Sequence, residues 1–148
     1  MKQFPNNPKR AVASFVPYKR TSDSFQFYLQ RRDLDAKRLP DWFGLFGGGL
    51  EEGETPDQAF LREVIEELNF DASKAIFFNR YEFFRSINHV YILEVDDAFE
   101  NAVEVREGQY GKFFSEKEAQ EQSKLMNFDK LILAQIAERL RKDNLTTF

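Results

Sequence analysis

The sequence contains no cysteine, and this absence excludes disulfide bonds and thiolate metal sites. It also lacks an apolar run of about 18 residues and a signal-peptide pattern near Met1, so we expect a cytoplasmic protein without a membrane partner. A single histidine, His89, is too little for a zinc site, and we expect it to be structural rather than catalytic. The 21 basic residues are outnumbered by 25 acidic ones, which argues against a nucleic acid polymer as the main partner.

The distribution of apolar residues predicts the fold class. The chain shows neither a compositional break nor an internal repeat, so we expect one domain over residues 1–148, with residues 1–9 as a loose N-terminal arm. Apolar runs and alternation predict strands at residues 10–16, 25–30, 75–84, 87–95 and 110–114. Helices are expected at residues 56–68, directly after Ser115, and at residues 129–142. This irregular order indicates an α/β protein in which helices enclose a mixed β-sheet.

The helix expected at residues 56–68 has well-marked ends. Thr55 can cap it while Gln58 reaches back, Pro56 suits the first helical position, and Asn69 tolerates the left-handed turn that ends it. At about 100° per residue, two opposite faces follow. The apolar face would hold Phe60, Leu61, Val64, Ile65 and Leu68. The acidic face would hold Glu63, Glu66 and Glu67.

These three carboxylates predict a metal site. Spacings of three and four residues bring them together, where like charges repel, and they lie in the half of the helix in which the macrodipole disfavours negative charge. A hard divalent cation such as Mg²⁺ or Mn²⁺ would reverse both penalties. A solvated acidic helix face is the alternative for the helix taken alone.

A glycine-rich segment before the helix favours the metal site. Gly47, Gly48 and Gly49 allow the backbone to approach a ligand closely and can turn carbonyl oxygens toward a cation. The segment also resembles the beginning of a phosphate-binding P-loop, but Glu54 stands where that motif requires lysine. Because a carboxylate repels phosphate, we expect any phosphate here to be bound through a metal.

Residues 48–70 resemble the Nudix box. The matching positions, at the spacing of the family pattern, are Gly48, Glu54, Arg62-Glu63-Val64, Glu66-Glu67 and Phe70. Asn69 departs from the pattern, which has glycine there, but both residues accept a left-handed helix end. Glu54 and Arg62 match a pair whose role in the family is structural, namely to tie the loop to the helix by a charge-assisted hydrogen bond.

The resemblance also implies a fold and a set of site residues. It implies the α/β/α sandwich of the family, and Glu63, Glu66, Glu67 and the backbone carbonyl of Gly47 as metal ligands. Either Glu63 or Glu66 could instead take the proton from the attacking water, and the sequence leaves this open.

Residues outside the box resemble the MutT-like branch of the family. The segment from Glu107 is similar to a loop that supplies a further metal carboxylate in that branch. Asn127 occupies a place comparable to an asparagine that contacts the base, with a helix-cap role as the alternative. Phe46 stands where that branch has proline, so we expect the loop and the substrate pocket to differ from those of that branch. Arg31 and the arginine after it are candidates for phosphate contacts or for a surface pair.

Together these features predict an enzyme. We expect divalent-metal-dependent hydrolysis of a pyrophosphate bond in a nucleoside triphosphate or a related nucleoside diphosphate derivative, with release of a nucleotide. The cofactor would be Mg²⁺ or Mn²⁺, the partner a small nucleotide, and a homodimer is possible. The alternatives are a nucleotide-sugar or dinucleoside-polyphosphate hydrolase and, in another class, a non-catalytic nucleotide-binding sensor domain.

Overall fold

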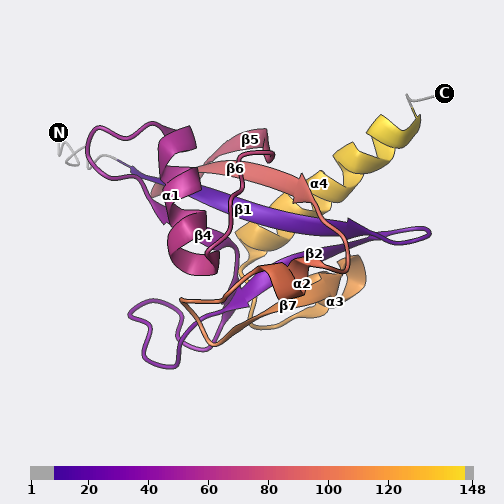
Figure 1. Cartoon of the computed structure of the whole chain (residues 1–148), viewed down its shortest axis with the longest axis horizontal. Coiled ribbons are helices and arrows are strands. Elements are labelled where there is room, and N and C mark those ends of the chain that lie inside the picture. The colour runs from indigo at the N-terminus through magenta and orange to yellow at the C-terminus, as the bar shows by residue number, and fades with distance from the viewer. Residues whose placement is uncertain (1–8, 146–148) are drawn as a thin grey trace, which may run out of the picture.

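A mixed β-sheet runs through the centre of the computed structural model, which describes residues 9–145 (Figure 1). The strands are β1 (Arg10–Arg20), β2 (Phe25–Arg31), β3 (Phe43–Gly44), β4 (Phe46–Gly49), β5 (Ile76–Glu82), β6 (Ser86–Glu94) and β7 (Tyr110–Ser115). The helices are α1 (Pro56–Leu68), α2 (Phe99–Ala102), α3 (Glu116–Glu121) and α4 (Asn127–Leu145). The sheet has the order β3-β2-β1-β6-β5, with β4 paired to β1 and β7 to β2. Strands β1 and β6 run parallel and the other pairs are antiparallel, so the sheet is mixed, as predicted.

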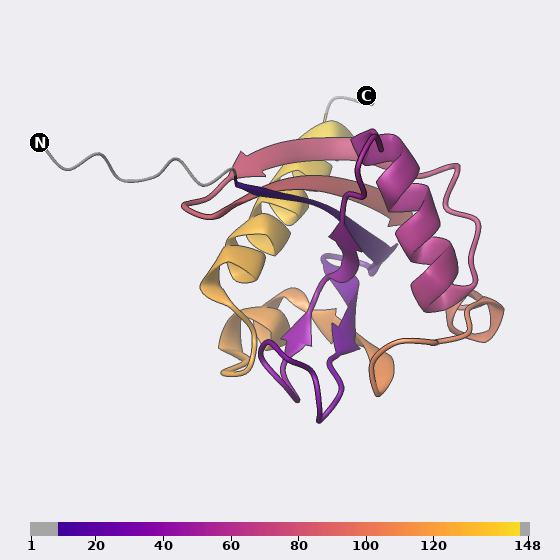
Figure 2. The same cartoon turned by 90° about the vertical axis from the view of Figure 1, so that its left-hand side faces the viewer.

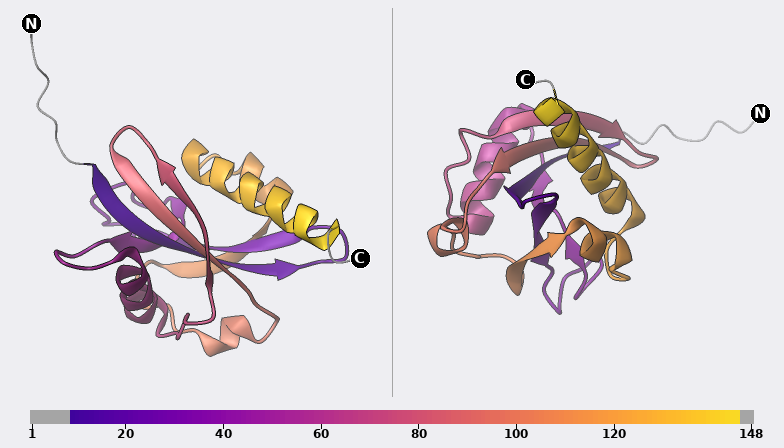
Figure 3. Two further views of the ribbon diagram at one scale, coloured as in Figure 1. Left: turned by 90° about the horizontal axis from the view of Figure 1, so that it is seen from above. Right: turned by 90° about the vertical axis from the view of Figure 1, so that its right-hand side faces the viewer.

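Helices α1 and α4 cover opposite faces of the sheet. Figure 2 shows α1 in magenta and α4 in orange to yellow on either side of the strands, and the views of Figure 3 agree. Two separate hydrophobic clusters fill the layers between them. Phe60 and Val64 of α1 pack with Phe15 in one cluster, and Ile132 and Leu133 of α4 belong to the other. The α/β/α sandwich expected from the sequence is therefore confirmed.

Strand β1 is longer than the sequence predicted. We expected it to end at Val16, but it continues through Pro17 to Arg20. Its neighbour changes at this point, because β4 pairs with residues 12–15 and β2 pairs with residues 18–20. Pro17 therefore falls between two antiparallel ladders, where the absent N–H removes no hydrogen bond to β2 or β4.

Other boundaries also differ from those predicted. Residues 83–85 join β5 to β6, where we expected a turn at residues 85–86, and the amide of Phe83 donates to the carbonyl of Ser86 at 2.8 Å. The glycines at residues 47–49 belong to strand β4 rather than to a loop, and α4 begins at Asn127. Residues 1–8 of the expected N-terminal arm lie outside the described residues. Within residues 9–145, no helix has the length and apolar character needed to cross a membrane.

Candidate active site

Local capping holds α1 in place beside the glycines. The Thr55 hydroxyl accepts a hydrogen bond from the Gln58 amide at 3.2 Å, and the Gln58 side chain accepts one from the Thr55 amide at 3.0 Å. At the other end, Asn69 adopts φ 49° and ψ 46°, and its amide donates to the Ile65 carbonyl at 2.9 Å. The helix therefore has the bounds that the sequence predicts, because both ends are encoded locally.

The buried face of α1 differs from the one predicted. Glu67 is 2% exposed, whereas Leu61 and Ile65 are 36% and 51% exposed. The buried face follows the spacing of Phe60, Val64 and Glu67, which are four and three residues apart and so lie on one side of a helix. The expectation that Glu67 lies opposite the apolar face was wrong, because packing against the sheet decides which side is inward.

Glu67 lies against the backbone of β4. The amide of Gly47 donates to both of its carboxylate oxygens at 3.2 Å. Burial raises the pKa of the Glu67 carboxyl, the Gly47 amide opposes this shift, and the charges of Glu63 and Glu107 raise the pKa further. The ionised form of the Glu67 carboxylate is therefore less favourable at this position than in water.

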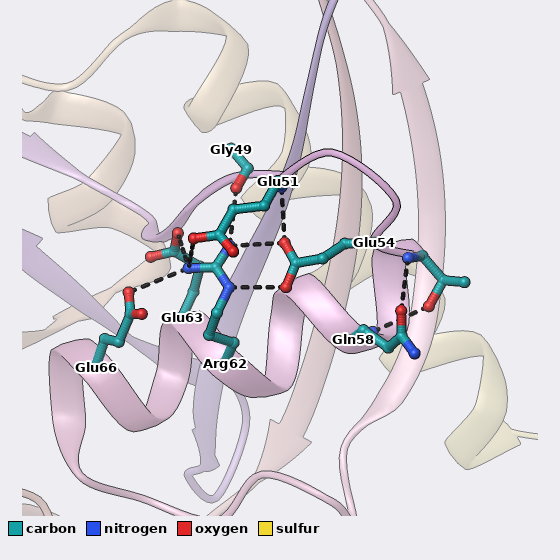
Figure 4. A network of polar contacts seen from close by, with 8 residues as sticks. Gly49, Glu51, Glu54, Gln58, Arg62, Glu63 and Glu66 are labelled. Atoms are coloured by element: carbon teal, nitrogen blue, oxygen red, sulfur yellow. Dashed lines mark hydrogen bonds and ion pairs between the residues drawn. The ribbon is translucent and has the colours of Figure 1, made fainter.

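Arg62 connects the helix to the glycine segment (Figure 4). Its guanidinium donates two hydrogen bonds of 2.8 Å to the carboxylate of Glu54, and a third of 3.1 Å to the carbonyl of Gly49. Its Nη1 also donates to Glu63 at 3.1 Å and to Glu66 at 3.2 Å. The Arg62 hydrogen bonds, together with the Glu51 amide, lower the pKa of Glu54 to about 2. The paired fork geometry makes Glu54 and Arg62 a rigid brace between the loop and α1.

Gly48 approaches the Glu63 carboxylate closely. A Cβ atom at residue 48 would lie 2.5 Å from Oε1 of Glu63. The glycine is therefore required for the present position of the Glu63 carboxylate against β4.

A cavity of about 980 Å³ opens beside these carboxylates and extends to the start of α4. One wall is acidic and consists of Glu63, Glu66 and Glu107, next to the glycines of β4. Arg10, Arg32 and Arg38 contribute positive charge, and Phe43, Phe83 and Phe128 contribute aromatic surface. Polar groups also line it: Ser14 donates to the Asn88 side-chain oxygen at 2.8 Å, and Gln30 donates to the Glu107 carbonyl at 2.9 Å. Such a cavity suits an anionic ligand with a planar apolar part.

The carboxylates fit a divalent cation by their chemistry. Within residues 9–145, no three acidic, histidine or cysteine side chains already stand in the geometry of a metal site. Burial raises the pKa of Glu107, and the charges of Glu63 and Glu66 raise it further. The carboxylates of this acidic wall therefore repel one another. Oxygen ligands with excess negative charge are those that Mg²⁺ and Mn²⁺ prefer. Arg62 engages one oxygen of Glu63 and one oxygen of Glu66, so the second oxygen of each carboxylate is not bonded to Arg62.

Two residues expected to bind substrate lie outside the cavity lining. Arg31 donates to Asp41 at 2.9 Å and to the Tyr110 hydroxyl at 3.1 Å, and it lies over the ring of Phe43. Asn127 is exposed on the surface at the first turn of α4. Its side chain makes no hydrogen bond within the part of the chain that the structure describes, so it does not act as a helix cap there.

The structure instead brings other residues to the cavity. Arg32 and Arg38 line it from the loop after β2, and Asp129 lines it from α4, two residues beyond Asn127. The sequence predicts residue 129 only as the start of the last helix, so no local pattern distinguishes Asp129 as a cavity residue. His89 is half-buried in β6 and does not line the cavity; burial, aided by the nearby charge of Arg80, lowers its pKa.

Comparisons with known proteins agree with this architecture. The sequence matches the family model described as the NUDIX domain over residues 8–141. Curated protein sequences gave no match. Among solved structures, the chain is similar to the NUDIX domain of Shewanella oneidensis NrtR complexed with ADP ribose, at 16% identity and a TM-score of 0.73, covering 93% of this chain and 94% of that one.

Two further solved structures are similar to the chain. A mutT/nudix family protein from Listeria innocua has 18% identity and a TM-score of 0.74, with 96% of this chain and 100% of that one covered. A C. elegans Ap4A hydrolase binary complex has 19% identity and a TM-score of 0.66, with 90% and 98% covered. At these identities the structures establish a shared fold, and the family model spans most of the sequence. The chain therefore belongs to the NUDIX family of pyrophosphohydrolases.

Proposed function

We propose that the protein hydrolyses a pyrophosphate bond in a nucleoside triphosphate or a related nucleoside diphosphate derivative, and that it releases a nucleotide. The observation that carries this proposal is that one cavity is lined both by Glu63, Glu66 and Glu107 and by arginines that are free to bind phosphate. Within residues 9–145, the guanidinium groups of Arg10 and Arg38 form no ion pair. Anions are therefore attracted to a cavity whose acidic side requires a cation.

Different residues of the site would bind the cation and accept the proton. Glu63, Glu66, Glu67 and Glu107, with the Gly47 carbonyl, would hold Mg²⁺ or Mn²⁺. When bound, such an ion neutralises phosphoryl charge and lowers the pKa of a coordinated water. Either Glu63 or Glu66 would take the proton from the attacking water.

The remaining residues position this machinery. The bidentate pair of Arg62 and Glu54 holds α1 against the glycine segment, so the carboxylates stay aligned with β4. The hydrogen bonds from Arg62 to Glu63 and Glu66 keep both side chains on the cavity side of the helix before a cation enters.

Two other classes of substrate are candidates because of the names of the similar structures. One of those structures contains ADP ribose and another is named an Ap4A hydrolase, so nucleotide sugars and dinucleoside polyphosphates belong in any substrate panel. Both ligands keep a nucleoside attached to a phosphoanhydride, which agrees with the proposed reaction.

A product-release assay tests the proposal. Nucleoside triphosphates, ADP-ribose, nucleotide sugars and dinucleoside polyphosphates should be incubated with the protein and Mg²⁺ or Mn²⁺, and the products separated by chromatography. We expect a nucleotide product from at least one class, and its loss in excess EDTA. Glu66→Gln should lose the activity, and Glu52→Gln, at an exposed acid in the loop before α1, should retain it. Binding of nucleotides without any turnover would instead identify a sensor domain.

A further inference from the structure

Gln30 is a buried polar side chain that the proposed reaction does not use. It lies near the end of β2, it is 7% exposed, and it lines the cavity. Its partners across the sheet are Gly44 of β3 and Gly111 of β7, so neither neighbouring strand places a side chain beside it at this level. An amide buried in such a place requires a hydrogen-bond partner.

The partner of Gln30 is the backbone of Glu107. The Nε2 atom of Gln30 donates to the Glu107 carbonyl oxygen at 2.9 Å. The next residue, Gly108, has a φ of +86°, and a Cβ atom there would lie 2.8 Å from Cγ of Gln30 and 3.0 Å from its Nε2. The glycine therefore leaves the space that the Gln30 side chain occupies.

Backbone hydrogen bonds hold the chain on both sides of Glu107. Before it, the Arg106 amide donates to the Glu67 carbonyl at 2.7 Å, near the C-terminal end of α1. After it, the Gln109 amide donates to the Arg31 carbonyl at 2.8 Å, at the end of β2. Residue 107 is therefore tied to both α1 and β2.

We infer that Gln30 is a positioning residue, which fixes Glu107 on the acidic wall of the cavity where a divalent cation would bind. This inference rests on the proposed function, in which Glu107 would share a cation with the carboxylates of α1. The charges of Glu63 and Glu66 act on Glu107 and repel it from this wall. A hydrogen bond to the peptide group of Glu107 opposes that displacement, and it reduces the conformational freedom that the residue would lose when an ion binds.

Binding of Mn²⁺ to the protein alone tests the inference. The free ion is counted by its paramagnetic resonance signal during a titration. Gln30→Met keeps the length of the side chain but cannot donate, and we expect it to weaken Mn²⁺ binding roughly tenfold. Its melting temperature in EDTA should fall by only a few degrees. Gln26→Met makes the same change at the other end of β2, outside the cavity lining, and should keep the Mn²⁺ affinity of wild type.

A double-mutant comparison separates the positioning of Glu107 from a general effect on the fold. Glu107→Gln should itself weaken Mn²⁺ binding, and Gln30→Met added to it should change the affinity by less than about twofold, because the positioned carboxylate is gone. Gln30→Asn keeps a buried amide but is one methylene shorter, so it should act as Gln30→Met does and replaces that variant if it does not fold. Equal weakening with and without the Glu107 carboxylate, or no weakening at all, would overturn the inference.

The same titrations distinguish this inference from the proposed function, because they require no turnover of a nucleotide. If Mn²⁺ binding depends on Gln30 only when the Glu107 carboxylate is present, but no nucleotide is hydrolysed, the proposed reaction fails and the role of Gln30 stands. If nucleotides are hydrolysed while Gln30→Met and Glu107→Gln act independently on Mn²⁺ binding, the reaction stands and the positioning role is overturned.

Discussion

At the scale of single residues, Gly48 and Gly47 are both close to other atoms, but they should respond differently to substitution. A Cβ atom at Gly48 would meet the end of the Glu63 side chain. A Cβ atom at Gly47 would meet the backbone carbonyl of Ala13, and Gly47 itself has a φ of +132°. We expect Gly48→Ala to lower kcat by roughly a hundredfold with little change in melting temperature, because it displaces a reacting group. Gly47→Ala should destabilise the fold by more than about 1 kcal/mol.

Steady-state kinetics and thermal melts of both variants check this contrast. Gly53→Ala is the control, because Gly53 also has a positive φ, 82°, but no atom lies within 4 Å of its Cβ position. It should lose about 1 kcal/mol of stability and keep full activity. A Gly48→Ala protein that melts much lower yet turns over normally would contradict the assignment of Glu63.

Asp129 should make stability depend on pH in a definite direction. Burial raises its pKa from 3.8 to about 6, so the folded state binds its proton more tightly than the unfolded state. The contribution of the protonated group is complete below pH 3.8 and is lost as the pH rises to about 6. Asparagine carries no proton that can be lost in this range. As the pH rises from 3.8 to about 6, the free energy of unfolding of Asp129→Asn should therefore come to exceed that of wild type by up to about 3 kcal/mol. Urea unfolding at pH 4 and pH 7 measures the gain, and an equal difference at both pH values would refute it.

At the scale of elements, α1 shows what a sequence can and cannot predict. Both of its ends were predicted to the residue, because Thr55, Gln58 and Asn69 act through contacts within a few residues. Its inward face was not, because Glu67 faces the sheet through a contact with the Gly47 amide of β4, 20 residues earlier and beyond the reach of local helix signals. The same reason explains Pro17, whose place in β1 depends on two partner strands.

The cap of α1 should therefore control both stability and the site. Thr55→Ala removes the hydroxyl that accepts from the Gln58 amide and should cost about 1 kcal/mol. Because the first turn precedes Arg62, fraying there should also loosen the carboxylates and lower kcat. Thr55→Ser keeps the hydroxyl and should restore both values. Chemical denaturation and kinetics of the pair measure this, and equal stability of the alanine and serine variants would show that the cap is unimportant.

At the scale of the whole molecule, the candidate site lies where separate segments converge. The box residues were found from sequence because they occupy one continuous stretch that folds as a unit. Asp129, Arg38 and Asn88 reach the same cavity from α4, a loop and β6, and only the sheet order brings them together. Arg31 illustrates the converse, since Asp41 and Tyr110 engage a residue that sequence alone suggested for phosphate.

Removal of divalent cations should separate activity from folding. The two hydrophobic clusters that hold α1 and α4 on the sheet contain none of the four carboxylates. Excess EDTA should therefore abolish hydrolysis and leave the far-ultraviolet circular dichroism spectrum unchanged. Mg²⁺ should raise the melting temperature, because an ion at one hundred times its Kd stabilises the folded state by about 2.7 kcal/mol. Robust turnover in EDTA would contradict the metal-dependent reaction.

Glu63→Gln should weaken the effect of the cation on both the activity and the thermal stability of the protein. The variant keeps an oxygen that can accept from Arg62, but it removes a charge that raises the pKa of Glu67 and Glu107. Without metal it should therefore melt no lower than wild type, while its activity falls by orders of magnitude and its response to Mg²⁺ shrinks. Glu52→Gln should match wild type in all three measurements. If Glu63→Gln melts lower in EDTA and still gains as much from Mg²⁺ as wild type, Glu63 holds the fold together rather than the cation, and the acidic wall of the cavity has another purpose.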